Sequence, residues 1–300
     1  MLRPGRTVFI GESLVDSFTS FGNIVERFGG GPFNASMVLG SLKSPVRFVS
    51  SISQDEYGRE ICALLRRSGV NIDFSVFSEL PTTLAQAELN DEGNASFSFN
   101  INETSIMEEI PEELVSGSLV GASCLAIGSL GIVLDNFRRA TRFAVEEAKD
   151  GATIFLDPNI RPAIINEGLG RKRYLECLEW FCSRSRVVKC SVEDLMWWFP
   201  NNSLRNSVDS LLSQGPELIV LTRGSEGASA YFKKDEMHSK TERTDNSNYI
   251  GAGDSFFGAL ISFFSMNGEA MFADRKLISD CLLYSNKVAH NWIERGIATL

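Results

Sequence analysis

The sequence predicts an α/β protein with a doubly wound, mostly parallel sheet and a small β-sheet lid. Short apolar or β-branched runs alternate with longer segments of helical periodicity along most of the 300 residues. This alternation is typical of a parallel sheet covered by helices on both faces. Two segments break the alternation and predict the lid. The chain is long enough to bury one large core, so we expect residues 1–300 to form a single three-layer domain.

The predicted main sheet is built from short apolar runs, each followed by a longer connection, as βαβ units require. The predicted strands are Thr7–Ile10, Val46–Ser50, Ser123–Ile127, Thr153–Leu156, Val187–Lys189 and Leu218–Leu221. Apolar residues at helical spacing predict helices over Glu56–Arg67, Leu134–Lys149, Lys172–Cys182, Leu204–Leu212 and Lys276–Arg295, the last of which ends at Gly296. Ligands of such sheets bind beyond the carboxyl ends of the strands.

The predicted lid comes from two segments without helical periodicity. Ser20–Gly31 shows no helical pattern, and Thr82–Ile101 has two alternating runs around the turn residues Asn90–Asn94, which predicts a hairpin. We expect residues 17–31 and 82–101 to form a small sheet that stands off the main body. Such a flap usually closes over a bound substrate, although an edge hairpin without a role fits the same pattern.

The composition excludes several classes of partner. The net charge of −9 opposes binding to nucleic acid and to anionic membranes. The N-terminal apolar run is too short for a signal peptide, and no stretch is long enough to span a membrane. The six cysteines contain no CxxC pair and are typical of a reduced, cytoplasmic protein. The two histidines lack partners at metal-ligand spacing.

The stretch "GAGDSFFGAL" from Gly251 to Leu260 predicts a phosphate site at the start of a helix. The first N–H groups of a helix lack intrahelical partners and carry the positive end of its dipole. Glycines beside them let a ligand approach the backbone, so Gly251, Ala252 and Gly253 form a candidate anion hole. Asp254 is either an N-cap or a base that accepts the proton of an attacking hydroxyl. The local sequence leaves both interpretations open.

Further polar residues and glycines follow other predicted strands. Gly30 and Gly31 precede Pro32, which suits the first turn of a helix. In that turn Asn34 either binds a pair of polyol hydroxyls or is merely solvated. Asp16 follows the first strand, and Asp157, Asn159 and Arg161 follow a later one. The nucleotide motifs GxxxxGK[ST] and GxGxxG are both absent.

These segments together resemble the PfkB (ribokinase-like) family of carbohydrate kinases over nearly the whole chain. Six motifs occur in the order typical of that family. They are GExLxD at Gly11–Asp16, GGGPxN at Gly29–Asn34, the lid hairpin at Thr82–Phe99, DPNxRP at Asp157–Pro162, LTxGxxGA at Leu221–Ala228 and GAGDSFxGAL at Gly251–Leu260. The GE opening and DPNxRP are most similar to the fructokinase and 2-keto-3-deoxygluconate kinase branch.

The resemblance implies a ribokinase-like fold and transfer of the γ-phosphoryl group of ATP to a sugar hydroxyl. It implies that Asp254 is the general base, that Gly251, Ala252 and Gly253 form the anion hole, and that Mg²⁺ bridges the phosphates. The implied sugar contacts are Asp16, Gly30, Gly31, Asn34, Phe99 and Arg161. The implied nucleotide contacts are Asp157, Lys189, Thr222, Gly224, Gly227 and Asn286. Such a reaction needs an oriented hydroxyl, a base within reach and neutralised charge on the transferred group.

The chain departs from the family pattern in three places. Asn248, Tyr249 and Ile250 replace the usual Asp-Thr before GAGD, which puts a bound K⁺ in doubt. The element that organises Mg²⁺ through water is altered around Lys189, and Glu193 is the predicted replacement, with Asp194 as its alternative. The lid lacks the family's arginine near Phe99–Ile101. A keto-acid sugar would need a cation there, so fructose is the expected substrate.

Two other functions remain compatible with the sequence. Phe33, Phe97 and Phe99 are aromatic residues against which a nucleoside or another small alcohol could bind. The departures at Asn248 and Tyr249 are compatible with a catalytically impaired homologue that binds sugar or nucleotide. We also expect that an exposed lid strand can pair with a second subunit, giving a homodimer through the lid.

Overall fold

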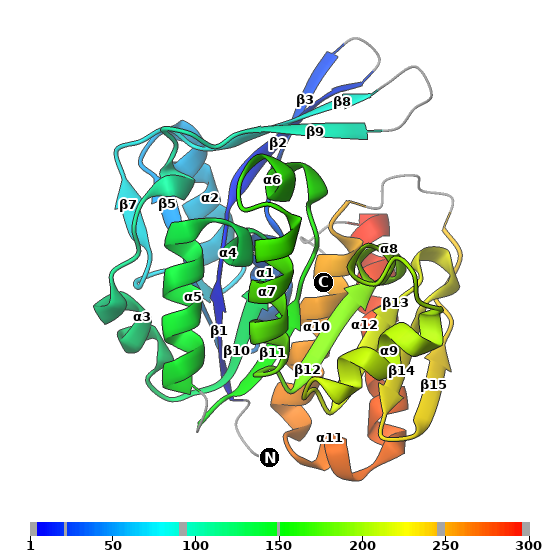
Figure 1. Ribbon diagram of the computed structural model, residues 1–300. Helices are drawn as coiled ribbons and strands as arrows, with labels where there is room; N and C mark the ends of the chain where they lie inside the picture. The colour runs from blue at the N-terminus through cyan, green and yellow to red at the C-terminus, as the bar shows by residue number, and fades with distance from the viewer. Residues whose placement is uncertain (1–4, 21–22, 90–94, 149–150, 245–249, 296–300) are drawn as a thin grey trace.

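The computed structural model describes residues 5–20, 23–89, 95–148, 151–244 and 250–295. Its centre is a nine-stranded sheet in the order β15-β14-β13-β12-β11-β10-β1-β4-β6 (Figure 1). The strands are β1 (Arg6–Ile10), β4 (Val46–Val49), β6 (Val70–Asn71), β10 (Ala122–Gly128), β11 (Thr153–Asp157), β12 (Val187–Ser191), β13 (Leu218–Thr222), β14 (Ala228–Phe232) and β15 (Asp235–Ser239). All neighbouring pairs from β13 to β6 are parallel, whereas β14 and β15 pair antiparallel at one edge.

The order of the sheet reverses between β1 and β10. From β1 the chain proceeds to β4 and β6 on one side, then returns to β10 on the other side and proceeds toward β15. In open α/β sheets the carboxyl ends of the strands beside such a reversal mark the ligand crevice. The fold therefore directs attention to the residues that follow β1 and β10.

Helices cover both faces of the sheet, which makes the protein three layers deep (Figure 1). One face packs against α1 (Gly31–Ser41), α2 (Glu56–Arg67), α10 (Ala252–Asn267), α11 (Ala270–Ala273) and α12 (Arg275–Arg295). The other packs against α3 (Glu112–Leu119), α4 (Leu130–Val133), α5 (Asp135–Ala148), α6 (Pro162–Glu167), α7 (Arg171–Cys182), α8 (Val192–Trp198) and α9 (Leu204–Ser213). Successive side chains of β1 point to opposite faces of the sheet. Val8 and Ile10 belong to the hydrophobic cluster on one face, and Phe9 belongs to the cluster on the other.

The lid is a separate four-stranded sheet in the order β3-β2-β8-β9. Its strands are β2 (Leu14–Ser20), β3 (Asn23–Gly29), β8 (Leu84–Leu89) and β9 (Ala95–Asn100). The β2–β8 pair is parallel and the other two are antiparallel. The sheet projects from the carboxyl-end side of the main sheet, at the top of Figure 1.

The predicted fold class and lid are confirmed, and most predicted bounds are correct within two residues. The tip of the predicted hairpin, Asn90–Asn94, and the predicted helix end at Gly296 lie outside the described residues. The lid begins earlier than predicted, because β2 starts at Leu14. Asp16 is therefore a residue of a lid strand and does not lie at the end of the first main strand. The division into one domain stays a prediction.

Several short elements are not among the predicted ones. They are the two-stranded pair β5 (Ser51–Ser53) and β7 (Val76–Ser78), the strands β6 and β15, the helices α3, α4, α6, α8 and α11, and the 3₁₀ turns η1 (Ser105–Met107) and η2 (Gly224–Glu226). Elements of two to eight residues carry too few periodic positions to be recognised in a sequence. Among the described residues, no helix is long and apolar enough to cross a membrane.

Candidate active site

A hydrogen-bonded carboxylate joins the two strands at the reversal of the sheet. Glu12 follows β1, and its Oε1 accepts hydrogen bonds from Ser129 Oγ after β10 (2.6 Å) and from the backbone N–H of Gly31 (3.2 Å). Its Oε2 is buried and has no hydrogen-bond partner in the part of the chain that the structure describes. Burial raises the pKa of Glu12 above its ordinary value, although the bond from Ser129 opposes this. Glu12 thus fixes the start of α1 against both strand ends.

Neither Glu12 nor Ser129 is among the predicted site residues. Their signal in the sequence is weak, because each is a single polar residue after a strand. The backbone gives a further indication, since Ser129 has a positive φ of 51° and Gly128, directly before it, packs against the carbonyl of Asp157. A non-glycine residue in that conformation is uncommon and often occurs at a functional site.

The glycines before α1 allow four segments to meet. A Cβ on Gly30 would lie 2.6 Å from the carbonyl oxygen of Glu12, and Gly30 has a φ of 112°. A Cβ on Gly31 would lie 2.6 Å from Asn159 Nδ2 and 3.3 Å from Asp254 Oδ1. Only glycine fits such a junction. The start of α1 therefore lies against both the residues after β11 and the start of α10.

Asn34 and Asp254 form the central contact of this junction. Asn34 Nδ2 donates to Asp254 Oδ2 at 2.9 Å, and Asn34 is only 6 % exposed. The alternative in which Asn34 is solvated is therefore wrong. The N-cap interpretation of Asp254 is also wrong, because Gly251 is the N-cap of α10 and no side chain caps that helix. The carboxylate of Asp254 is instead held beside the first turn of α10, at its positive end.

The backbone before α10 is ordered by a tryptophan that the sequence did not single out. Gly251 has a left-handed φ of 79°, and a Cβ there would lie 2.9 Å from Trp292 Nε1. That indole N–H donates to the carbonyl of Ile250 at 3.1 Å, while Ser255 Oγ donates to the carbonyl of Gly251 at 2.7 Å. Asn248 and Tyr249, two of the three residues that stand in place of the family's Asp-Thr, lie outside the described residues.

A buried ion pair lies under the candidate anion hole. Lys189 Nζ donates to Asp157 Oδ2 at 2.7 Å, and both side chains are buried. Lys189 Nζ would also lie 3.2 Å from a Cβ on Gly253. Burial raises the pKa of Asp157 to about 6, against the lowering effect of Lys189. Burial alone would lower the pKa of Lys189, but Asp157 raises it above its ordinary value, so the ammonium stays charged beside the first turn of α10.

Asp16 brings the lid to the same place. Its pKa is raised to about 6, first by burial and also by Asp254, while Arg161 lowers it. The carboxylate of Asp16 lies against Gly29, so close that a Cβ on that glycine would clash with it. Arg161 is exposed at the start of α6, where its Nη1 contacts the carbonyls of Asn159 (3.4 Å) and Ile160 (3.3 Å). Phe99 pairs with Ala85 through the β9 backbone, and its side chain lies outside the described residues.

Four of the six predicted nucleotide residues lie around the ends of β13 and β15, whereas Asp157 and Lys189 form the ion pair on β11 and β12. Thr222 Oγ1 donates to the carbonyl of Cys190 at 3.4 Å. Gly227 has a φ of 94°, and a Cβ there would lie 2.1 Å from the carbonyl oxygen of Ser239. That same oxygen accepts a hydrogen bond from Asn286 Nδ2 at 2.9 Å. Gly224, with a φ of 55°, has open space around its Cα. The buried amide of Asn286 thus joins α12 to the end of β15.

The structure does not gather ligands for a metal ion around Glu193. Glu193 is exposed in the first turn of α8. Asp194 is occupied, because it closes a capping box with Ser191 and accepts from the backbone N–H of Ile160 at 2.8 Å. Among the described residues, no three histidine, cysteine, aspartate or glutamate side chains form a metal-binding group. A cation at this site would therefore depend on ligand oxygens.

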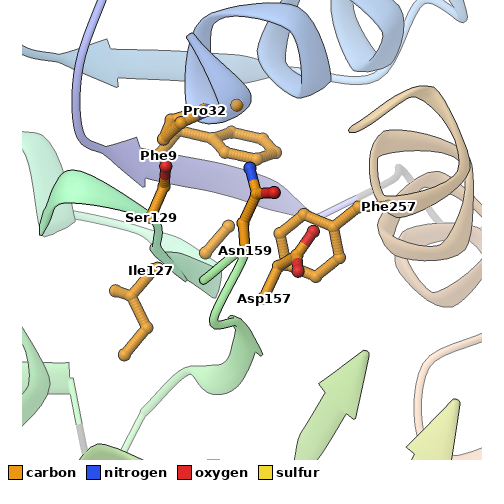
Figure 2. Close-up of a pocket in the computed structure, with 10 residues that line it drawn as sticks. Phe9, Pro32, Ile127, Ser129, Asp157, Asn159 and Phe257 are labelled. Atoms are coloured by element: carbon orange, nitrogen blue, oxygen red, sulfur yellow. The ribbon is translucent and has the colours of Figure 1, made fainter. Parts of the chain in front are cut away.

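A cavity of about 10 Å³ lies beneath the junction, between the strand ends and helices α1 and α10. Figure 2 shows Asn159 pointing from the end of β11 toward Pro32, with Asp157 beside Phe257. Such a cavity holds one water molecule at most. A substrate would have to bind above it, between the junction and the lid.

The chain is similar to known carbohydrate kinases over nearly its whole length. The model of the pfkB family carbohydrate kinase matches residues 13–298. A fructokinase of Rhizobium leguminosarum bv. trifolii is 27% identical over 268 residues, 86% of this chain and 79% of the relative. The crystal structure of fructokinase from Vibrio cholerae O395 in fructose, ADP and calcium ion bound form has a TM-score of 0.85 at 19% identity and covers 99% of this chain and 96% of that one. The structure of fructokinase with bound ATP from Xylella fastidiosa has a TM-score of 0.84 at 22% identity, covering 96% and 92%.

Proposed function

This chain belongs to the pfkB family of carbohydrate kinases and is an ATP-dependent sugar kinase, and we propose that fructose is its acceptor and Asp254 its general base. The hydrogen bond from Asn34 to Asp254 carries the proposal. This bond holds the carboxylate of Asp254 at the positive end of α10, beside the candidate phosphate site. Because a carboxylate repels phosphate, its presence there indicates a chemical role. Accepting the proton of the attacking hydroxyl is that role.

The charge on the transferred phosphoryl group is neutralised by groups beside Asp254. The backbone N–H groups of Gly251, Ala252 and Gly253 form the anion hole, and the buried ammonium of Lys189 lies next to Gly253. Fixed hydrogen-bond donors that face developing charge lower the activation free energy of phosphoryl transfer by several kcal/mol. Thr222, Gly224, Gly227 and Asn286 line the nucleotide site.

The sugar lies between the main sheet and the lid. Asp16, Asn34 and Arg161 hold its hydroxyls, and Gly30 and Gly31 keep the wall of the site free of side chains. Asp16 lies on lid strand β2, so closing the lid brings this acceptor to the sugar and excludes water. Fructose is favoured because curated relatives over most of the chain are fructokinases. Phe99 stays a predicted lid contact.

The kinase uses a divalent cation with ATP, and we infer that this cation is Mg²⁺. When bound, Mg²⁺ would screen the phosphate charges and orient the γ-phosphoryl group. The buried Oδ1 of Asp157 lacks a hydrogen-bond partner among the described residues, which suits a water molecule of its hydration shell. Glu193 stays a predicted contact through water. K⁺ is not needed in this proposal, since neutral donors already bind the carbonyls of Ile250 and Gly251.

A panel of acceptors tests the proposal directly. ADP release is measured with fructose, other ketoses and aldoses, 2-keto-3-deoxygluconate and adenosine, using the wild-type protein and the Asp254→Ala variant. Fructose is expected to give the highest kcat/KM, and Asp254→Ala is expected to lower kcat by about 10²–10⁴. Turnover of fructose that survives Asp254→Ala, or a better acceptor of another class, would contradict the proposal.

The two alternative functions have less support in the structure. Phe33 is fully buried in the core, so it cannot stack on a nucleoside, and the side chains of Phe97 and Phe99 lie outside the described residues. An impaired homologue is disfavoured because Asp254, Asn34, Lys189 and the glycines all lie together. Binding of ATP and Mg²⁺ without turnover of any acceptor would favour it.

We expect the kinase to work in the cytoplasm as a homodimer. All six cysteines are free thiols, which suits a reducing compartment, and a fractionation experiment would test the location. The outer lid strands β3 and β9 have no further strand partner among the described residues, so they offer edges to a second lid.

A further inference from the structure

We infer that the groove between α5 and α7 binds a phosphate monoester at a second site, separate from the candidate active site. The groove has a volume of about 320 Å³ and is lined by Arg138, Arg142, Leu169, Arg173, Glu176, Cys177 and Trp180. That volume lies at the lower end of the range for small-molecule sites. None of these residues belongs to the candidate active site.

The groove concentrates positive charge in a protein whose net charge is −9. Of its three arginines, Arg138 is paired with Asp135, and the other two share the groove with one carboxylate, Glu176, which leaves a balance of about one positive charge. A phosphate monoester carries about −1.5 to −2 charges at pH 7. The sign of this charge is opposite to that of the groove, and the two arginines of the groove that lack an ion pair among the described residues, Arg142 and Arg173, can each bind a phosphate oxygen.

Two other neighbouring carboxylates, Glu109 and Glu146, are bound outside the groove and do not neutralise it. Glu109 pairs with Arg139, and Glu146 pairs with Arg184 at 3.3 Å. In the described part of the chain, neither Arg142 nor Arg173 has an ion pair with a carboxylate. Arg142 and Arg173 are both exposed, so their guanidinium groups can donate hydrogen bonds to a ligand. Arginine forks suit the oxygens of phosphate.

Arg138 forms a fixed floor between the two exposed arginines. Its Nη1 donates to the carbonyl of Val133 at 2.7 Å, it pairs with Asp135, and its side chain is only 13 % exposed. Burial lowers the pKa of Arg138, and the neighbouring Arg173, Arg142 and Arg139 lower it further. The arginines thus repel one another in the free protein, and a dianion would relieve this repulsion.

Trp180 and Leu169 give the groove an apolar wall. The guanidinium carbon of Arg142 lies 4.3 Å from the centre of the Trp180 ring, a cation–π distance that holds Arg142 at the rim. The guanidinium carbon of Arg184 also lies 4.0 Å from the centre of this ring. The organic part of a phosphate ester, which inorganic phosphate lacks, would therefore contact Leu169 and the part of Trp180 that the two guanidinium groups leave uncovered. We therefore expect an ester with an apolar or ring portion to bind more tightly than inorganic phosphate.

Calorimetric titration with phenyl phosphate and inorganic phosphate at low ionic strength tests this site. The variant Arg142→Gln/Arg173→Gln is compared with wild type and with Arg66→Gln/Arg67→Gln, which removes two exposed charges from the last turn of α2. The groove variant is expected to bind phenyl phosphate about 100-fold more weakly, roughly tenfold for each lost charged hydrogen-bond donor. The α2 variant is expected to bind as wild type does.

A third variant separates the apolar wall from the charges. Trp180→Phe keeps the arginines and is expected to reduce the preference for phenyl phosphate over inorganic phosphate. Equal binding to wild type, the groove variant and the α2 variant would place the phosphate elsewhere, for example at the start of α10, and would overturn the inference. Absence of binding to the wild-type protein would also overturn it.

Discussion

In the proposed function, the residue pair Asp254 and Asn34 turns a helix start into a reaction centre. They are 220 positions apart, and their hydrogen bond joins α10 to α1. An amide donor at this distance supports the carboxylate and still leaves Oδ1 to accept a proton from a hydroxyl. The glycine at position 31 is part of the same arrangement, since a Cβ there would lie 3.3 Å from that Oδ1.

The pH dependence of fructose phosphorylation follows from Asp16. Its pKa is raised to about 6, and as a sugar contact it must be ionised to accept hydrogen bonds from hydroxyls. Below pH 6 we expect kcat/KM for fructose to fall about tenfold per pH unit. The pH profile of kcat/KM measures this, because it reports the free enzyme. Asp16→Asn is expected to have low kcat/KM without an acidic limb near pH 6.

A second carboxyl of the candidate site has the same raised pKa and must be distinguished from Asp16 as the source of the acidic limb. Asp157 also has a pKa of about 6, but it pairs with Lys189 and does not face the sugar in this proposal. An acidic limb that persists in Asp16→Asn would assign the effect to another group and contradict the prediction. The titration of these two carboxyls does not destabilise the fold in this pH range. Both carboxyls bind protons more tightly in the folded state, so their contribution to stability grows as pH falls from about 6 to 3.8.

At the scale of elements, the segment before α10 decides how the anion hole is ordered. Its two carbonyls, of Ile250 and Gly251, accept hydrogen bonds from Trp292 on α12 and from Ser255 on α10. A helix that packs beside α10 thus supplies a neutral donor close to the phosphate site. The sequence shows only that this segment differs from the family pattern.

We therefore predict that the kinase does not depend on K⁺. Replacing K⁺ by Na⁺ or tetramethylammonium at constant ionic strength is expected to leave kcat unchanged. Trp292→Phe keeps an aromatic ring under Gly251 but removes the N–H donor, so it is expected to raise KM for ATP and lower kcat. The rate of ADP release measures both effects.

Two comparisons complete that experiment. Trp180→Phe, on the far helix α7, is the matched control and is expected to leave kcat and KM for ATP unchanged. Strong activation of the wild-type protein by K⁺ would mean that a cation orders the segment, and it would refute the prediction.

At the scale of the molecule, the lid is a small sheet above the candidate site whose outer strands, β3 and β9, have no further strand partner among the described residues. Its strand β2 carries Asp16 and pairs with both β3 and β8, so the lid cannot shift without moving a substrate residue. Pairing with a second lid would cover an edge that otherwise invites nonspecific strand addition.

We predict a dimer of this 33.1 kDa chain that forms through the lid edge. Sedimentation velocity is expected to give twice the chain mass. Val25→Lys on edge strand β3 is expected to shift the protein toward the monomer, because a two-fold interface brings the new charges of both copies together. Val120→Lys, at the C-cap of α3 and outside the lid strands, where the residue is 68 % exposed, is the control. A wild-type monomer at every concentration would rule the dimer out.

The fold was predictable where local pattern and tertiary role agree. The strands β1, β10, β11 and β13 are apolar because both of their faces are buried, and α2, α5 and α9 carry a clear apolar stripe against the sheet. The glycines before α1 and α10 were predictable for a similar reason, because a close backbone approach to a ligand requires glycine whatever surrounds it.

The sequence by itself determined the α/β class and the lid, and it predicted a phosphate site at the start of α10, since each depends on a few adjacent residues. Only the tertiary structure decided that Asp254 is not an N-cap, that Glu12 joins β1 to β10, and that Trp292 binds the segment before α10. It also brought the arginines of α5 and α7 into one groove. These contacts join residues up to 220 positions apart. Their pairing is set by helix packing and sheet order, which leave no local pattern in the chain.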